Sequence, residues 1–174
     1  MILFLDTEFT NLRQSAHLIS LALVSTCGKS FYAVFEDWSW ETCSDFVKEG
    51  VISKLDLTDK TTGTCIIKGG KKEIVAALKE WLDQFEEIQI WADVPHYDWV
   101  LFCELFGGAL HIPQHIHYMC MDLATLLLAK GYNHNETRIN LISNKEHPKH
   151  YKIHNALSDA TLGMTILKKL LNKE

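Results

Sequence analysis

The hydrophobic pattern along the chain begins with short apolar runs that are typical of strands. Residues 2–5 (ILFL) are wholly apolar, as expected of a strand that is buried on both faces. Residues 18–25 and 31–36 are rich in β-branched and aromatic side chains, and the turn-like residues 26–29 separate them. We therefore predict three strands at the start of the chain, the last two forming a hairpin-like pair.

After residue 70, helical stripes alternate with short strands. Apolar residues recur at helical spacing in the segments 71–85, 96–107 and 155–171. Further strands are expected over 88–92 and 115–121, the second leading into a helix over 122–130. This alternation predicts an α/β fold with helices packed on a sheet.

Residues 37–70 are less regular, with a predicted helix from about Trp40 to Glu49 and then a polar stretch rich in Thr, Lys and Gly. We see no internal repeat and no linker rich in Pro, Gly or Ser. Because 174 residues also suit one domain, residues 1–174 are expected to form a single domain.

The composition excludes several classes of protein. With 47% hydrophobic and 22% charged residues, the chain is neither disordered nor of low complexity. No apolar run approaches the roughly 18 residues of a membrane span, and the opening MILFLDTEFT lacks the basic start of a signal peptide. The five cysteines are scattered without a CxxC pair, so we expect a reducing, cytoplasmic location.

The net charge of -5 is unevenly distributed. Residues 130–174 hold eight of the 17 lysines and arginines but only four of the 22 acidic residues. An acidic body with a basic C-terminal segment could hold both cations and a polyanion. An ordinary solvated surface explains the same charges.

Two carboxylates follow the first apolar run, in the sequence Asp6-Thr7-Glu8. The period of two in a strand places Asp6 and Glu8 on the same face, roughly 7 Å apart along the chain. Such carboxylates repel each other when they are buried, and a hard cation such as Mg²⁺ or Mn²⁺ would remove the repulsion. The alternative is that both side chains face solvent just past the strand.

Two further segments carry acidic residues at element starts. Asp98 follows the strand predicted over 88–92 and lies in the first turn of the next helix, where the helix dipole alone would favour a carboxylate. Asp93 is a competing carboxylate in the loop before it. His154 and Asp159 would point about 140° apart on one helix, so we expect His154 in the loop before the last helix. From there it can reach the same site as Asp159, or it is simply exposed.

Taken in order, three segments resemble the exonuclease motifs of the DEDD superfamily. They are DTEF after an apolar strand, YDWVLF after a second strand, and HNALSDA at the start of the last helix. The histidine five positions before the last aspartate is similar to the DEDDh branch. The resemblance spans residues 4–165, and the small size and DTEFT opening look closest to the RNase T-like 3′ exoribonucleases of bacteria and phages. Asn11 and Val94 depart from the residues that many members have there, glycine and asparagine respectively.

This resemblance implies an RNase H-like mixed five-stranded sheet of order 3-2-1-4-5, with strand 2 antiparallel and helices on its faces. It implies metal-dependent hydrolysis of phosphodiester bonds from the 3′ end of RNA, releasing nucleoside 5′-monophosphates. The alternatives are single-stranded DNA as the polymer, because contacts to the 2′-OH cannot be read from a sequence, and a catalytically inactive nucleic-acid-binding module. Related enzymes are often homodimers, which we also expect here, without membrane association.

The resemblance further assigns roles around two divalent cations, Mg²⁺ or Mn²⁺, of the kind that activate a water and stabilise the leaving oxygen. Asp6 would be the shared ligand. Glu8 and Asp159 would complete the site of the attacking water, and Asp98 would support the second ion. His154 would be the general base, because histidine readily accepts a proton near neutral pH.

Side chains after Glu8 and a basic run before His154 are candidates for holding the nucleic acid. An aromatic ring can stack on a base, worth ~1–3 kcal/mol, although Phe9 can equally pack in the core. Lysines can hold phosphates through counterion release, or belong to a solvated loop. The substrate-binding candidates are Thr7, Phe9, Thr10, Lys149 and Lys152.

The histidines suggest one competing kind of site, a zinc centre. The candidate ligand sets are His111, His115 and His117, or His147, His150 and His154. Neither set has the spacing of a common zinc motif. The metal hypothesis therefore stays with the carboxylates.

Overall fold

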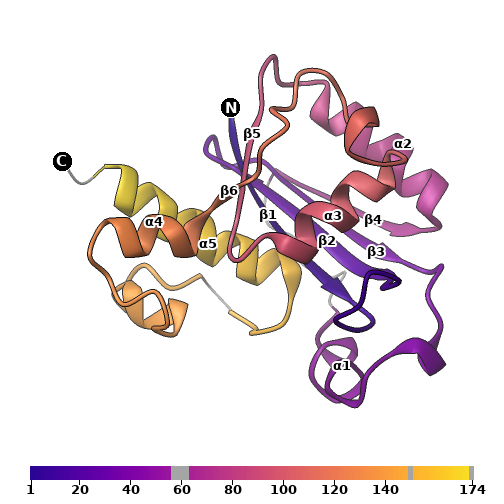
Figure 1. The fold of residues 1–174 in the computed structure, drawn as a ribbon, viewed down its shortest axis with the longest axis horizontal. Coiled ribbons are helices and arrows are strands. Elements are labelled where there is room, and N and C mark those ends of the chain that lie inside the picture. The colour runs from indigo at the N-terminus through magenta and orange to yellow at the C-terminus, as the bar shows by residue number, and fades with distance from the viewer. Residues whose placement is uncertain (56–62, 149–150, 173–174) are drawn as a thin grey trace.

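The computed structural model describes residues 1–55, 63–148 and 151–172. Figure 1 shows a twisted sheet with helices on both faces, and the strand order is β4-β3-β2-β1-β5-β6. β2 runs antiparallel to both of its neighbours, and the other pairs are parallel. The strands are β1 (Ile2–Phe9), β2 (Leu18–Ser25), β3 (Ser30–Phe35), β4 (Thr64–Gly69), β5 (Gln89–Ala92) and β6 (Met121–Asp122).

The helices form one layer on each face of the sheet. α2 and α3 cover one face, and α4 and α5 cover the other (Figure 1). The α-helices are α1 (Asp45–Gly50), α2 (Lys71–Leu82), α3 (His96–Leu105), α4 (Leu123–Ala129) and α5 (Ala156–Leu171). The 3₁₀ turns are η1 (Trp40–Thr42), η2 (Ile52–Lys54), η3 (Ala109–His111) and η4 (Arg138–Leu141). Among the described residues, no helix has the length and apolar character needed to cross a membrane.

β1 is buried from both sides, as its apolar start predicts. Leu3 and Leu5 belong to the hydrophobic cluster under α2 and α3, whereas Phe4 belongs to the cluster under α4 and α5. This alternation is the period of two expected of a strand. The same alternation points Asp6 and Glu8, which follow Phe4 at even-numbered positions of β1, toward α4 and α5.

The order expected for five strands is present, and the structure adds a sixth strand. β3-β2-β1-β5-β6 corresponds to the expected 3-2-1-4-5, with the second strand antiparallel. The additional strand is β4, in the stretch predicted only as polar. It pairs on one side, with β3, and Cys65 and Lys68 in it are exposed. An edge strand keeps such polar and exposed positions, so its hydrophobic pattern is weak.

Three other boundaries differ from the sequence-based expectation. β1 continues through Phe9, so Asp6 and Glu8 lie within the strand rather than after it. The helix predicted over Trp40–Glu49 is divided into η1 and α1, because Ser44 caps α1 by accepting a hydrogen bond from the Val47 amide at 3.3 Å. The strand predicted over 115–121 is reduced to the two residues of β6 and an isolated bridge between Ile88 and Ile116.

Residues 40–54, which we call the α1 segment, lie beyond the end toward which β1 points (Figure 1). The Ser44 amide donates to the Thr10 carbonyl at 2.9 Å, and the Asn11 side chain donates to the Thr42 carbonyl at 3.0 Å. Cys43, Val47 and Val51 pack with Ile19 of β2 in a small hydrophobic cluster. The α1 segment is therefore attached to the residues that directly follow β1.

Candidate active site

Three carboxylates from opposite ends of the chain meet between β1 and α5. Asp6 and Glu8 share the face of β1 that carries Phe4, which is the face that α5 covers. Asp159 lies in the first turn of α5. Oxygen atoms of these three side chains all lie within 4.8 Å of one another. Hard oxygen ligands at such spacing suit a divalent cation.

The close approach of α5 to β1 depends on a glycine. A Cβ atom at Gly163 would lie 2.2 Å from Cε1 of Phe4, whose side chain is almost completely buried. Gly163 is four residues after Asp159 and therefore one helical turn away on the same side of α5. The missing side chain at this position lets the helix bring Asp159 to the β1 carboxylates.

Burial and mutual repulsion raise the pKa values of the cluster. Burial is the largest cause that holds the pKa of Asp6 well above its usual range, followed by the charge of Asp98 and then those of Asp159 and Glu8. Burial, with the charges of Asp159 and Asp98, raises the pKa of Glu8 to about 8, against the opposing charge of Lys54. A bound cation would reverse this, because it favours the ionised carboxylates.

Asp98 lies beside the cluster and is held by β1. Its Oδ1 atom accepts hydrogen bonds from the Thr7 amide at 2.9 Å and from the Thr7 hydroxyl at 2.6 Å. Burial raises the pKa of Asp98, while the two bonds from Thr7 act in the opposite direction. Its carboxylate is not one of the three that meet within 4.8 Å, but its charge is the largest electrostatic influence on Asp6.

Asp159 is bound by three donors from the loop that precedes α5. The Tyr151 hydroxyl donates to Oδ1 at 2.7 Å, and the amides of His154 and Asn155 donate to Oδ2 at 2.8 and 3.2 Å. Burial raises the pKa of Asp159, and the bond from Tyr151 is the largest opposing influence. The carboxylate therefore fixes the conformation of the loop that carries His154.

His154 lies in the loop, as the helical geometry predicts, and it has an unusual backbone. Its φ angle is 61°, in the left-handed region that costs an L-residue roughly 1–2 kcal/mol. The hydrogen bond from its amide to Asp159 offsets that cost. Its imidazole lies against the ring of Phe46, with the ring centroids 4.9 Å apart and the planes nearly perpendicular.

A cavity of about 260 Å³ connects these groups, and Asp6, Tyr151, His154 and Asp159 line it. Asp93, the competing carboxylate of the sequence analysis, lines the same cavity but is paired with Arg138. The guanidinium donates to Asp93 from Nε at 2.6 Å and from Nη2 at 2.9 Å. Asp93 is thereby held in a bidentate ion pair with Arg138.

Of the substrate-binding candidates near β1, Thr7 and Thr10 are buried and only Phe9 is partly open to solvent. Thr7 is buried against Asp98, and Thr10 is fully buried with its hydroxyl accepting from the His17 amide at 3.1 Å. Phe9 is half-buried and stacks on Tyr97, with ring centroids 5.7 Å apart. Near His154, Lys152 has an exposed side chain, and Lys149 lies outside the described residues.

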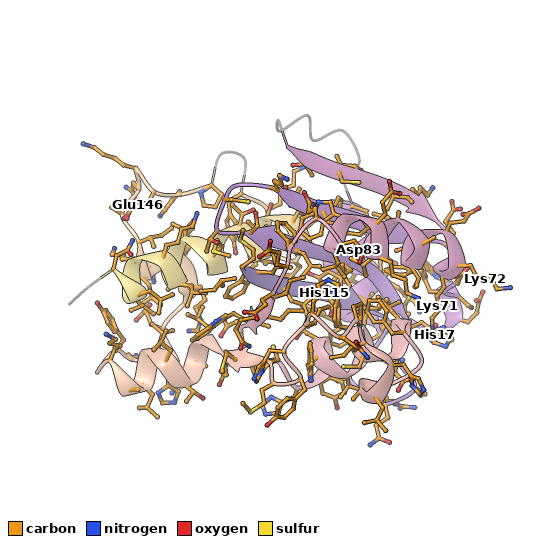
Figure 2. All side chains as sticks on the ribbon, turned by 90° about the horizontal axis from the view of Figure 1, so that it is seen from above. His17, Lys71, Lys72, Asp83, His115 and Glu146 are labelled. Carbon is orange, nitrogen blue, oxygen red and sulfur yellow. The ribbon has the colours of Figure 1, made fainter. Side chains whose placement is uncertain are left out.

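A larger cavity of about 950 Å³ lies on the other side of the strand end, between the loop after β1 and α3. His17 and Lys71, which Figure 2 labels at one end of the molecule, belong to its lining. None of the three clustered carboxylates lines it. The larger of the two cavities is therefore not the candidate active site. The clustered carboxylates identify the smaller cavity instead.

The histidine alternative does not form a site in the part of the chain that the structure describes. There, the one group of three or more His, Cys, Asp or Glu side chains close enough for a shared ion is Asp6, Glu8 and Asp159. His111, His115 and His117 therefore form no such group. The second set contains His150, which lies outside the described residues.

Four residues of the site were not found from the sequence. Arg138 and Tyr151 carry side chains that bind Asp93 and Asp159, and the α1 segment contributes Phe46 and Lys54. Arg138 had one available signal, since the chain contains only two arginines. The others approach the site through contacts between distant segments, which no local pattern records.

The mixed sheet has this strand order, and acidic residues cluster on its central strand β1 and in the first turn of α5. Together these two features define an RNase H-like nuclease of the DEDD type. Solved structures agree in fold. The Mg²⁺- and Mn²⁺-bound form of Pop2p from S. pombe matches 99% of this chain and 83% of its own, with a TM-score of 0.63 and 12% identity. The RNase domain of yeast Pop2 matches 97% of this chain and 77% of its own, with a TM-score of 0.60 and 12% identity.

The chain belongs to the Rv2179c-like 3′-5′ exoribonuclease domain family, whose profile matches residues 1–171. It is 28% identical over 130 residues to the 3′-5′ exoribonuclease Rv2179c of Mycobacterium tuberculosis H37Rv, covering 74% of each chain. The 3′-5′ exoribonuclease MT2234.1 of strain CDC 1551 gives the same values. The sequence-based prediction that the protein is a 3′-5′ exonuclease, and specifically an exoribonuclease, is confirmed.

Proposed function

We propose that this protein is a metal-dependent 3′-5′ exoribonuclease that releases nucleoside 5′-monophosphates, with residues 1–174 acting as one catalytic domain. The observation that carries the proposal is the convergence of Asp6, Glu8 and Asp159 within 4.8 Å at a largely buried place. Uncompensated, this arrangement of negative charge is unfavourable. The relatives' names support RNA as the substrate.

We assign the carboxylates to two divalent cations, Mg²⁺ or Mn²⁺, with Asp6 shared, Glu8 and Asp159 on the ion of the attacking water, and Asp98 supporting the other. Such ions activate a bound water and stabilise the leaving oxygen. The residues present fit this chemistry, because the cluster offers only hard oxygen donors. Thr7 holds Asp98, and Tyr151 holds Asp159, so both carboxylates are oriented before an ion binds.

His154 is assigned as the general base that takes the proton of the attacking water. It lines the same cavity as Asp6 and Asp159, and its backbone is tied to Asp159. Phe9, Thr7, Thr10, Lys149 and Lys152 remain proposed substrate contacts. The position of Phe9 directly after Glu8, in a half-buried stack with Tyr97, supports this proposal.

The test is degradation of a 5′-labelled single-stranded RNA with Mn²⁺, with Mg²⁺ and with EDTA. We expect a ladder that shortens from the 3′ end only with metal, and release of nucleoside 5′-monophosphates. Asp6→Asn, purified in parallel, should be inactive, which excludes a contaminating nuclease. Intact RNA that is merely bound would contradict the proposal and support a non-catalytic module. A DNA oligomer of matched sequence tests the polymer, since a clear preference for DNA would overturn the assignment to RNA.

We also propose a cytoplasmic location and a homodimer. The scattered free cysteines support the location, because the described thiols form no disulfide. Sedimentation of the purified protein tests the dimer, and a monomer at micromolar concentration would contradict it.

A further inference from the structure

Arg138 and Asp93 form their ion pair in the wall of the active-site cavity. The catalytic candidates Asp6, His154 and Asp159 line the same cavity. Both members of the pair are largely withdrawn from solvent, with 20% of the Arg138 side chain and 26% of the Asp93 side chain exposed. The pair is therefore part of the surface that metal ions and a substrate phosphate would meet.

The guanidinium of Arg138 is almost completely engaged by its neighbours. Nε and Nη2 donate to the two oxygens of Asp93, and Nη1 donates to the carbonyls of His134 and Glu136 at 2.9 and 2.8 Å. These bonds use all but one of the N–H groups of an arginine. Arg138 thus holds Asp93 and the loop before η4, and it has little capacity left to bind a phosphate itself.

The loop that carries Asp93 is strained at the next residue. Val94 has a φ angle of 52°, in the left-handed region that a β-branched residue rarely adopts. Its amide donates to Oδ1 of Asp122 at 3.1 Å, and its carbonyl accepts from the His96 amide at 2.9 Å. Such strain costs ~1–3 kcal/mol and persists where the surrounding structure enforces it. The fold therefore places Asp93 at this position against a local backbone preference.

Asp93 is close enough to influence the clustered carboxylates. Burial is the largest cause of the raised pKa values of Asp6 and Asp98, and the charge of Asp93 adds to both. A free carboxylate at such a place could bind a divalent cation, because these ions prefer oxygen ligands. Both oxygens of Asp93 accept hydrogen bonds from Arg138 instead, and Asp93 is not among the carboxylates that meet within 4.8 Å.

We propose that Arg138 is a positioning residue that withholds the Asp93 carboxylate from the cations of the active site. This rests on the proposed function, since it concerns the ligand set of the same metal ions. An additional free carboxylate in the cavity would attract the cations more strongly, but it would also repel the phosphate of the RNA. The ion pair therefore favours turnover over the tightest binding of metal.

The experiment measures the Kd of Mn²⁺ by calorimetry for Arg138→Gln, Asp93→Asn and the double variant. Arg138→Gln should lower the Kd about ten- to 100-fold, the usual size of effects from residues around a metal site, because the freed carboxylate joins the ligands. Asp93→Asn should raise the Kd, because the charge of Arg138 is then unpaired. The double variant, which lacks both charges, should return close to the wild-type Kd. Arg138→Lys retains a positive charge and should shift the Kd less than Arg138→Gln does.

Activity on single-stranded RNA at saturating Mn²⁺ gives a second readout. Although it binds Mn²⁺ more tightly, Arg138→Gln should lower kcat/KM about ten- to 100-fold, mainly through a higher KM, and the double variant should recover most of this loss. A role limited to folding predicts that both single variants bind Mn²⁺ more weakly, and that the double variant is no better than either. That result, or an unchanged Kd in both single variants, would overturn the proposal.

Lys68→Gln and Glu36→Gln are the matched controls, because they make the same changes of charge at the β4 edge. These two residues form an ion pair with an N–O distance of 3.1 Å and side chains that are 51% and 55% exposed, and their substitution should leave the Kd of Mn²⁺ unchanged. Circular dichroism checks folding. If Arg138→Gln is unfolded, Arg138→Lys and Asp93→Asn carry the comparison, and an unchanged Kd in Asp93→Asn contradicts the proposal.

The two readouts separate this proposal from the proposed function. If the wild type binds Mn²⁺ but degrades no RNA, the proposed activity fails, while opposite shifts of the Kd in Arg138→Gln and Asp93→Asn would still support the role of Arg138. If the wild type degrades RNA and both variants shift the Kd in the same direction, the activity stands and the role of Arg138 is wrong.

Discussion

At the scale of single residues, Asp159 performs two tasks at once. One of its oxygens faces Tyr151, the other accepts from the amides of His154 and Asn155, and the carboxylate still lies within reach of Asp6 and Glu8. The conformation of the base-bearing loop and the ligand set of the proposed ion therefore depend on one side chain. Mutation of Asp159 cannot separate these roles, whereas mutation of His154 can.

His154→Ala should reduce turnover on the order of 10²–10⁴-fold, because a positioned proton acceptor contributes that much to a rate. Binding of Mn²⁺, followed by calorimetry, should be nearly unchanged, since the imidazole is not among the clustered ligands. His154→Asn is a useful second variant, because asparagine tolerates the left-handed backbone. His111→Ala, on the exposed η3 turn, serves as the control, and turnover at the wild-type level in both variants at position 154 would exclude His154 as the base.

At the scale of elements, the hydrophobic pattern of the sequence predicts the sheet and its main helices. It does not predict how the side chains of the site contact one another. The apolar start of β1 and the stripes of α2 and α5 predict their positions because burial determines those residues. β4 escapes detection because an edge strand buries only part of its surface. The contact between Phe46 and His154 joins residues more than a hundred positions apart, and only the docking of whole elements creates it.

The packing of α5 on β1 gives a prediction at this scale. Gly163→Ala places a methyl group against Phe4, and overpacking of this kind costs about 1–3 kcal/mol, partly offset by the better helix propensity of alanine. Displacement of α5 should also weaken Mn²⁺ binding, because Asp159 moves with the helix. Chemical denaturation and calorimetry measure the two effects.

Combining Gly163→Ala with Phe4→Leu should restore part of both losses, since the smaller side chain makes room for the methyl group. Gly50→Ala is the control, because a Cβ there meets only ordinary contacts with Phe46. An unchanged stability and affinity in Gly163→Ala would show that the contact does not set the position of the helix.

At the scale of the whole molecule, the clustered carboxylates of the active site lower the free energy of unfolding of the metal-free protein. The folded state holds the pKa of Glu8 near 8, above its ordinary value of 4.5, so the folded state binds a proton over this range that the unfolded chain has lost. The contribution of Glu8 to the free energy of unfolding is therefore highest below about pH 4.5, and it falls as the pH rises toward 8. Asp6 acts in the same direction.

We expect the melting temperature in EDTA to fall between pH 5 and pH 8, and Mn²⁺ to raise it more at pH 8 than at pH 5. A cation at 100 times its Kd adds about 2.7 kcal/mol, which corresponds to roughly 5–10 °C for a chain of this size. Glu8→Gln should melt higher than the wild type in EDTA at pH 8 and lose most of the response to Mn²⁺. Equal melting curves for both proteins with and without metal would show that no cation compensates Glu8.

The shared volume of Phe4 and Gly163 has an evolutionary consequence. The two positions are far apart in the sequence yet occupy one space, so a relative that acquires a larger residue at the position of Gly163 needs a smaller one at the position of Phe4. The two sites should therefore covary among homologues, and the pairing should be strictest in lineages that keep all of the acidic residues.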